Sequence, residues 1–589
     1  MISILPTHIT SFRAFGWVQD PSNLRSLCDV VAIFDETSKK HKELIDTIIP
    51  SLVEQRDGRE LLIDVMNTRP LLIPYSMLVG TSFTPRKDSR CNGIVQATVK
   101  GQSRDFIGDW PADNFVRWAH AFGFIKYSYS DDAFSITSSG LELTKAKEGE
   151  ELSEKEIELL TKAVLAYPPA VRILNLLAET ENTHLTKFEL GRNLGFIGEG
   201  GFTSLPQSIL IRSLATTESA SEKNKMKADW DGSSDKYARM ISKWLCKLGL
   251  VEQLPKEITV SIGTKEYTEV IGQAYIITGK GIAALRKTIG NSKHKRIAKN
   301  VCFEMFATKG SDREYLRTRR SYILKFLSES KEEVSVSSIM NYLSTMKIEE
   351  VAETIDDDIK GLINIGLNII KTNTGFLWAD TINDFIIPVS QNLAKSSLAE
   401  IKDEIRPQMT HLSHEYLSLI DLAYDSVQNR LFEMKTLELL TEECKFTGLH
   451  LGGSRKPDGI IYTNDLTENY GVIVDTKAYS KGYNLPISQA DEMERYIREN
   501  QTRDKKINSN EWWLNFNTNI ETYYFMFVAG HFIGNFVNQL ERISMSTGVY
   551  GTALSVKNML ICANAIKSGD MCHEDMKNNM FHNSEYQII

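Results

Sequence analysis

The sequence contains few cysteines, and their arrangement would build neither a metal site nor a disulfide framework. Its seven cysteines are scattered over 589 residues, and no two of them form a C-x-x-C pair. This spacing argues against zinc ribbons and favours reduced thiols, as in the cytosol. Long apolar runs are also absent, although a membrane span needs roughly 18 apolar residues in succession. No basic segment followed by an apolar stretch opens the chain, so we expect no signal peptide and no membrane partner.

The chain also lacks the overall positive charge that marks many proteins binding nucleic acid. Its formal net charge is −8, with 42% hydrophobic and 24% charged residues, which is typical of soluble globular proteins. A chain of 589 residues is too long for one core and predicts three to five domains. Local patches matter more for binding than the sum, and residues 281–320 hold eleven Lys or Arg against three Asp or Glu. This basic stretch, including Arg317, Arg319 and Arg320, fits either a solvated linker or phosphate contact.

A weak internal repeat appears when two tryptophans, Trp118 and Trp244, are aligned. Each begins a helical pattern that stops at a glycine, and an apolar strand and a returning strand follow. Helix, glycine, strand, turn and strand make up the second half of a winged helix. The segments that show the pattern, the last pair being a degenerate third copy, are 118–125 with 133–141, 244–251 with 274–282, and 360–369 with 375–378. We expect the first two units to bind DNA, and the third to contact DNA or to serve as a docking platform.

Near the C-terminus, charged residues gather at the ends of two predicted strands. The pattern predicts strands over 459–463 and 471–477, joined by a polar turn over 464–469. Asp475 and Lys477 are two residues apart and therefore project from the same face. Asp458 opens the first strand and can meet them. Two carboxylates and a lysine suit a Mg²⁺ ion acting on a phosphodiester, which is the PD-(D/E)xK nuclease pattern. Alone, the motif also fits a solvated turn.

Longer segments around this motif resemble the type IIS restriction endonucleases of the FokI family. In the C-terminal half, the similar segments are 450–459, 470–480, 482–487, 489–496, 499–503 and 510–513. In the N-terminal half, they are 15–19, 118–124, 167–174, 201–206, 232–240 and 358–364. The resemblance therefore covers essentially the full chain.

This resemblance implies a multidomain α+β and α/β protein. Three winged-helix recognition subdomains precede a PD-(D/E)xK restriction-endonuclease-like α/β cleavage domain. We predict the subdomains at 1–155, 156–292 and 293–386, a linker at 387–395 and the cleavage domain at 396–589. Such an enzyme binds a short asymmetric duplex DNA site, and we expect a GGATG-like site here. It makes a Mg²⁺-dependent double-strand break at a fixed distance downstream and leaves 5′-phosphates. We expect a transient homodimer on DNA and, in the bacterial cytoplasm, a cognate methyltransferase in the same restriction system.

The resemblance also assigns roles to single residues. It implies that Asp458, Asp475 and Lys477 are catalytic, with the two aspartates as metal ligands. It implies that Asp491 and Arg495 cross between two cleavage domains, although an Asp–Arg pair four apart also fits an intrahelical contact. Glu494 replaces a glutamine of the family and adds a negative charge there. The residues implied to contact DNA are Gln19, Asp20, Arg86, Trp110, Asp231, Lys236 and Arg239.

Two other functions remain open at this point. A winged-helix regulator could carry a nuclease-like domain as a scaffold without catalysis, and the intact Asp458, Asp475 and Lys477 argue against this hypothesis. A strand-specific nicking enzyme with impaired dimerisation is the second alternative. Asp491 and Arg495 argue against it, because both members of the expected intermolecular pair are present.

Overall fold

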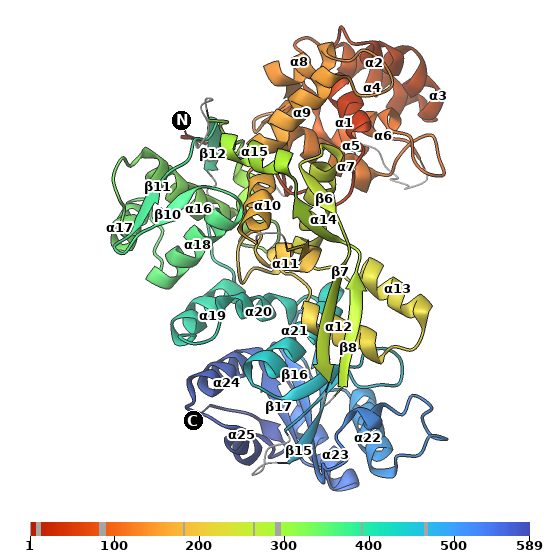
Figure 1. Ribbon diagram of the computed structural model, residues 1–589, viewed down its shortest axis with the longest axis vertical. Coiled ribbons are helices and arrows are strands. Elements are labelled where there is room, and N and C mark those ends of the chain that lie inside the picture. Colours follow the sequence, from red (N-terminus) through yellow and green to blue (C-terminus); the bar gives the residue numbers. More distant parts are fainter. Residues whose placement is uncertain are drawn as a thin grey trace. The chain divides into compact units, whose positions relative to one another are not determined.

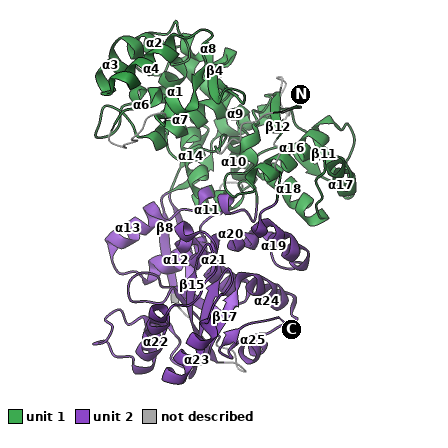
Figure 2. Cartoon of the chain, turned by 180° about the vertical axis from the view of Figure 1, so that it is seen from behind, with its two compact units in different colours: residues 1–196, 234–254, 273–394 green, residues 197–233, 255–272, 395–589 purple. Residues whose placement is uncertain are grey.

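The computed structural model describes residues 2–6, 13–81, 90–180, 183–262, 265–288, 296–389, 393–463 and 469–588. The chain forms two compact units (Figures 1 and 2). Unit 1 contains residues 1–196, 234–254 and 273–394. Unit 2 contains residues 197–233, 255–272 and 395–589. Within the described ranges, no helix is both long and apolar enough to span a membrane.

The predicted repeat is confirmed in all three copies. Helices α7 (Asp109–Ala121), α14 (Ser233–Lys247) and α18 (Ala352–Asn364) are each followed by a glycine with positive φ. The φ angles are 73° at Gly123, 72° at Gly249 and 104° at Gly366, a left-handed conformation that other residues adopt at a cost. The strand pairs that follow are β3 (Ile125–Ser128) with β4 (Ala133–Ile136), β6 (Val251–Gln253) with β9 (Ala274–Ile277), and β10 (Ile369–Lys371) with β11 (Phe376–Trp378).

The N-terminal half of each repeat copy completes a winged helix. A short strand joins the first two wings, giving the sheets β2-β4-β3 and β5-β9-β6. In the second and third winged helices, Thr186 and Ser335 cap the starts of α11 (Lys187–Arg192) and α17 (Val336–Thr345). The remaining elements around the first repeat copy, within residues 24–145, are α1 (Leu24–Ala32), α2 (Lys39–Glu43), a π-helix (Leu44–Ile48), α3 (Ile49–Leu52), α4 (Arg56–Asn67), β2 (Ile73–Pro74), α5 (Tyr75–Val79), α6 (Ile94–Thr98) and α8 (Ser138–Lys145).

The second and third repeat copies are accompanied by further helices. Those within residues 154–288 are α9 (Glu154–Ala166), α10 (Pro168–Glu179), β5 (Leu185–Thr186), α11 (Lys187–Arg192), a 3₁₀ turn (Gly200–Phe202), α12 (Gln207–Thr216), α13 (Ala220–Asp229) and α15 (Gly279–Thr288), and the 3₁₀ turn, α12 and α13 belong to unit 2. Those around the third are a 3₁₀ turn (Phe303–Phe306), α16 (Arg313–Glu329) and α17 (Val336–Thr345). Strand β1 (Ile2–Pro6) pairs in parallel with β12 (Phe385–Val389). Regular structure therefore continues to Val389, three residues into the predicted linker.

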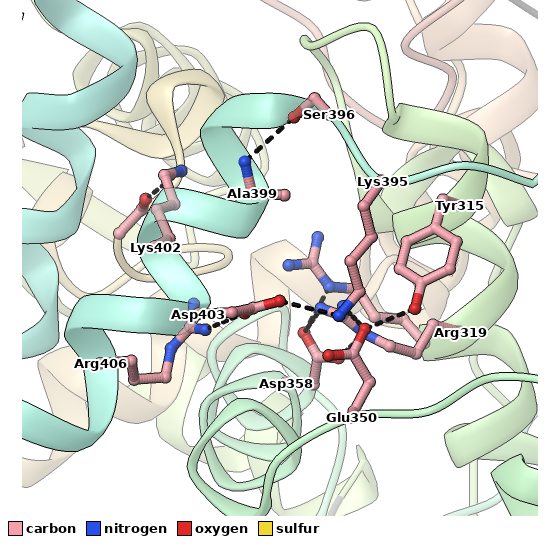
Figure 3. A network of polar contacts seen from close by, with 12 residues as sticks. Tyr315, Arg319, Glu350, Asp358, Lys395, Ser396, Ala399, Lys402, Asp403 and Arg406 are labelled. Carbon is pink, nitrogen blue, oxygen red and sulfur yellow. Dashed lines mark hydrogen bonds and ion pairs between the residues drawn. The ribbon is translucent and has the colours of Figure 1, made fainter.

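The basic stretch at residues 281–320 has a structural role at its C-terminal end, within the third winged helix. Arg317, Arg319 and Arg320 on α16 are buried, which excludes them as a phosphate-binding surface in this conformation. Arg319 Nε donates to Asp358 Oδ2 at 2.6 Å (Figure 3). Arg320 Nε donates to Asp358 Oδ1 at 2.7 Å. Arg319 also donates to Glu350, at 2.6 Å. Arg319 and Arg320 thus hold the third winged helix together, while Arg317 donates to the carbonyls of Ala307 and Arg13. For these three of the eleven cations, the phosphate-contact prediction is wrong.

The cleavage domain is built on a six-stranded sheet of order β13-β14-β15-β16-β17-β18. The first three strands are antiparallel, and β15 to β18 are parallel. The strands are β13 (Thr447–His450), β14 (Gly459–Tyr462), β15 (Tyr470–Lys477), β16 (Thr522–Ala529), β17 (Gly551–Ser555) and β18 (Ser584–Glu585). The predicted hairpin is confirmed as β14 and β15, while residues 464–468 of its predicted turn lie outside the described ranges.

Helices enclose this sheet and create its apolar core. Helices α22 (Ile487–Thr502) and α23 (Phe536–Thr547) pack together and cover one face (Figure 1). Their buried core includes Met493, Leu540, Trp512 and, from β15, Ile473. The other helical segments are α19 (Ser397–Ile405), a 3₁₀ turn (Arg406–Gln408), a 3₁₀ turn (His414–Leu417), α20 (Ser418–Leu422), a 3₁₀ turn (Ser426–Gln428), α21 (Asn429–Glu438), a π-helix (Leu439–Glu443), a 3₁₀ turn (Trp512–Asn515), α24 (Val556–Ser568) and α25 (His573–Met580).

Two segments of the predicted second subdomain belong to unit 2. They are residues 197–233 and 255–272, and the second of them contains a hairpin that the repeat did not predict. Its strands are β7 (Lys256–Ile262) and β8 (Lys265–Ile271), which lie on α12. Helix α12 also packs on α21 and β13 of the cleavage domain. The backbone of Gly200 donates to the Asp421 carboxylate at 2.6 Å, and Lys402 binds the same carboxylate at 2.7 Å.

Candidate active site

The ends of β14 and β15 bring the three predicted catalytic residues together. Lys477 Nζ lies 2.8 Å from Asp475 Oδ2, which confirms that the two side chains share a face of β15. Asp458 directly precedes β14, and its Oδ2 accepts from the Thr476 backbone amide at 2.7 Å. The Thr476 hydroxyl donates to the same oxygen at 3.0 Å. Asp475 is buried, Asp458 is half-buried, and Lys477 is mostly buried.

Burial and like charge shape the electrostatics of this cluster. Burial raises the pKa of Asp458 well above its usual range, and the carboxylates of Asp475 and Glu433 raise it further. Burial alone would lower the pKa of Lys477, but Asp475 and Asp458 hold it above the ordinary value. Lys477 is therefore an ammonium group at neutral pH. Its single positive charge faces several carboxylates, so the site favours binding of a further cation.

The loop that carries Asp458 is held from α22 and the segment after it. Tyr496 on α22 donates to the Lys456 carbonyl at 2.8 Å, and Asn508 donates to the Arg455 carbonyl at 2.8 Å. The loop turns through Gly452 and Gly453, whose φ angles are 48° and 88°. Glycine adopts this left-handed backbone without a Cβ penalty. The turn and its two anchors fix the direction from which Asp458 meets β15.

Two further residues of the site were not predicted from sequence. Glu433 lies on α21, and His450 ends β13. His450 Nε2 lies 3.0 Å from Glu433 Oε2. Glu433 stands 25 positions before Asp458, in a helix that is buried along most of its length. Nothing in the sequence of that helix signals its approach to the site, since the approach depends on how α21 packs against the sheet.

The donor set fits a hard divalent cation. Asp458 and Asp475 offer carboxylate oxygens, the ligands that such cations prefer. Within the ranges that the structure describes, no group of three or more His, Cys, Asp or Glu side chains is arranged to hold a metal ion. A cation held by two carboxylates, with water completing its shell, is the typical binding mode of Mg²⁺.

The predicted DNA-contacting residues fall in both units. In unit 1, the backbone amide of Gln19 donates to Asn114 on α7 at 3.0 Å, and its side chain contacts Tyr237 on α14. Trp110, at the start of α7, is 50% exposed, so its ring is available to a ligand. Lys236 and Arg239 are half-buried on α14.

The other three predicted DNA-contacting residues are Asp20, Asp231 and Arg86. Asp20 is exposed and lies close enough to Lys243 on α14 to oppose the lowering of the pKa of that lysine by burial and by Arg239. Lys243 was not singled out from the sequence. Asp231 belongs to unit 2 and precedes α14. Arg86 lies outside the described residues. The structure thus brings Gln19, Asp20 and the cations of α14 into one region.

The predicted dimerisation residues lie on α22 with partners in the same chain. Asp491 Oδ1 binds Arg542 Nη2 of α23 at 2.6 Å. Arg495 binds Glu492 at 3.0 Å. Both Asp491 and Arg495 are substantially exposed, and the alternative intrahelical pair between them is not what forms. Glu494 binds Arg498 at 2.8 Å.

Comparison with known proteins identifies the family. The chain is 45% identical over 583 residues to the type II restriction enzyme FokI of Planomicrobium okeanokoites, covering 98% of this chain and 99% of FokI. The chain belongs to the FokI family. It is also 34% identical over 588 residues to the type II restriction enzyme StsI of Streptococcus sanguinis, covering 98% of this chain and 96% of StsI.

Family and structural similarity extend over both halves of the chain. Residues 395–587 match "FokI, cleavage domain", residues 13–146 match subdomain 1 of the FokI recognition domain, residues 156–293 match subdomain 2, and residues 306–374 match "FokI, D3 domain". The structure of FokI gives a TM-score of 0.91 at 45% identity, covering 98% of this chain and all of that one. FokI bound to DNA gives 0.92 at 44% identity, with the same coverage.

These findings confirm the resemblance, the fold class and the enzyme class predicted from the sequence. The protein is a type IIS restriction endonuclease, a site-specific deoxyribonuclease that binds DNA. The FokI family implies a divalent metal cofactor, which agrees with the carboxylates of the site. Membership of an enzyme family argues against the non-catalytic regulator.

Proposed function

We propose that Asp458, Asp475 and Lys477 carry out phosphodiester hydrolysis and that Asp458 and Asp475 bind Mg²⁺. The observation that carries this proposal is the 2.8 Å contact between Lys477 and Asp475 at the strand end where Asp458 also lies. When bound, Mg²⁺ would stabilise negative charge developing at phosphorus and make a coordinated water more acidic. Lys477, as an ammonium group, orients the attacking water or the scissile phosphate. The products are a 3′-hydroxyl and a 5′-phosphate.

We propose that recognition of an asymmetric site depends on Gln19, Asp20, Arg86, Trp110, Asp231, Lys236 and Arg239. The residue types are suitable, because Arg and Lys can bridge guanine O6 and N7, Gln can pair with adenine and Asp can accept from cytosine N4. The sequence differs from the family pattern at Asp20, Asp231 and Ala228. A GGATG-like site is therefore our starting hypothesis, with the site itself to be read by experiment.

Cleavage of both strands is proposed to require a second cleavage domain, because one Asp458, Asp475 and Lys477 set hydrolyses one strand. Exposure of Asp491 and Arg495 on α22 supports a transient homodimer on DNA through this helix. Large apolar side chains are also exposed on α22 and the neighbouring α23, with Ile487 at 61% and Met545 at 85%. We further propose that a cognate methyltransferase protects the host DNA in the bacterial cytoplasm.

The deciding experiment is digestion of a randomised duplex library in the presence of Mg²⁺, with both cut ends sequenced. Cuts at a fixed distance from one asymmetric motif would support the proposed mode of action and define the site. Cuts confined to one strand would favour a nicking enzyme and contradict the dimer. Specific binding without cleavage would contradict the proposed catalytic centre.

A further inference from the structure

Buried His450 and half-buried Glu433 form a pair beside the catalytic carboxylates. His450 is 3% exposed, and its Nδ1 has no hydrogen-bond partner among the described residues. A neutral imidazole carries one N–H, and a buried donor without an acceptor is unfavourable. The proton therefore lies on Nε2, which donates to Glu433 Oε2 at 3.0 Å. This bond fixes one oxygen of the Glu433 carboxylate.

The orientation of His450 is held from a second side. Leu449 packs in the core on the α22 and α23 side of the sheet, so His450 projects to the opposite face. There it packs edge-to-face with the Trp230 ring, with centroids 5.9 Å apart. Arg430, one turn before Glu433 on α21, lies over the same indole at 4.5 Å. His450 is thus confined between Trp230 and Glu433.

The pair lies next to the residue that carries the first catalytic carboxylate. His450 is opposite Gly459 in the β13–β14 ladder, and the Leu451 amide donates to the Asp458 carbonyl at 2.9 Å. Leu437, one helical turn after Glu433, lies so close to Gly459 that an added Cβ would be 2.9 Å from it. The same face of α21 therefore approaches Asp458. The negative charge of Glu433 raises the pKa of the Asp458 carboxylate, although burial and Asp475 raise it more strongly.

We propose that Glu433, held by His450, is a positioning carboxylate of the metal centre. It increases cation affinity by accepting hydrogen bonds from the water shell of a cation bound to Asp458 and Asp475. Such a role agrees with the absence, among the described residues, of a cluster of three ligating side chains. Mg²⁺ keeps several waters when two carboxylates bind it, and these waters need acceptors. The inference rests on the metal site given under the proposed function.

The test is a calorimetric titration of the full chain with Mn²⁺ alone, without DNA. Glu433→Gln removes the charge but keeps an oxygen that accepts from His450, so the fold should be retained. Outer-shell partners typically contribute about 10-fold to 100-fold in metal affinity, and we expect a loss of that order. The Mg²⁺ concentration that gives half-maximal cleavage should rise in parallel. Glu404→Gln is the matched control, since Glu404 is 57% exposed and binds Lys557 at the surface.

Variants of His450 test whether it acts through Glu433. His450→Gln can still donate at the position of Nε2 and should keep most of the Mn²⁺ affinity. His450→Ala cannot, and should approach the affinity of Glu433→Gln. If His450 had a purely structural role, both variants would keep the native Mn²⁺ affinity and only their thermal stability would change. This result would contradict the proposal.

Asp475→Asn separates this inference from the proposed catalytic centre. Loss of Mn²⁺ binding in Asp475→Asn, with unchanged affinity in Glu433→Gln, would overturn the positioning role alone. Unchanged binding in Asp475→Asn would overturn the metal site and, with it, the role of Glu433. Weakened binding in both variants, with Glu404→Gln like the native chain, is the expected result.

Discussion

Arg542 of α23 binds Asp491 of α22 at 2.6 Å, although the family resemblance implies that Asp491 pairs with Arg495 of a second molecule. Asp491 is 58% exposed and Arg542 40% exposed. An exposed ion pair contributes only about 0.2–1 kcal/mol, so this contact is readily exchanged for another. The pair therefore satisfies Asp491 in the single chain without preventing an intermolecular contact.

Charge reversal at Arg495 should separate the two strand cleavages. Arg495→Glu places a like charge opposite Asp491 of a second molecule, and such a juxtaposition is repulsive. We expect nicking to persist while the rate of double-strand cleavage falls by about tenfold or more, which corresponds to ~1.4 kcal/mol. Supercoiled plasmid digestion distinguishes nicked from linear product. Lys567→Glu, on α24, is the control, and unchanged linearisation by Arg495→Glu would rule out the assigned interface.

Replacement of Asp475 by Asn should abolish cleavage and leave DNA binding intact. The change removes a charged metal ligand while keeping side-chain volume, and metal-assisted stabilisation is worth several kcal/mol. A rate loss of at least about 10³-fold is expected, since each 1.36 kcal/mol is tenfold. Single-turnover cleavage and a gel-shift measurement report the two properties. Residual cleavage near the native rate would show that Asp475 is not a catalytic residue.

Lys236 and Arg239 should differ in what they contribute to recognition. Arg239→Ala should cost about 1–3 kcal/mol of binding and relax specificity at one base pair, if its guanidinium bridges a guanine. Lys236→Ala should weaken binding uniformly across sequences and lower the salt slope by about one. Binding to a sequence library at several salt concentrations measures both. Equal, sequence-independent losses for the two variants would contradict base reading by Arg239.

The Arg319–Asp358 pair should control the stability of the third winged helix. Both side chains are buried, and removal of one partner of such a pair costs about 3–5 kcal/mol. Burial alone would raise the pKa of Asp358, but Arg319 and Arg320 hold it below the ordinary value. The stabilisation is therefore full above the unfolded pKa and lost as pH falls through the folded one.

Thermal unfolding between neutral pH and pH 3 measures this effect. Asp358→Asn should unfold at lower temperature at neutral pH, and the difference from the native chain should shrink as the pH falls below about 4. Glu60→Gln provides an exposed control, because Glu60 binds Arg56 at a surface where such pairs contribute little. A constant difference across the pH range would contradict the assigned role of the Asp358 charge.

Local patterns in the sequence determined much of this protein. The glycines after α7, α14 and α18 identified the winged helices, because each of these turns needs a left-handed residue. Alternation along β15 placed Asp475 and Lys477 on one face. Strand period and turn chemistry depend on neighbours in the chain, and this is why they could be read from the sequence alone.

Tertiary packing decided what the sequence pattern left open. From the sequence, Arg319 and Arg320 of α16 fitted either a solvated linker or phosphate contact, yet their burial against Asp358 makes them structural. Glu433 joins the metal centre only because α21 packs against β13 and β15. Charge, burial and partnership between residues far apart in the chain are set by the packing of helices on sheets, and no local period encodes them.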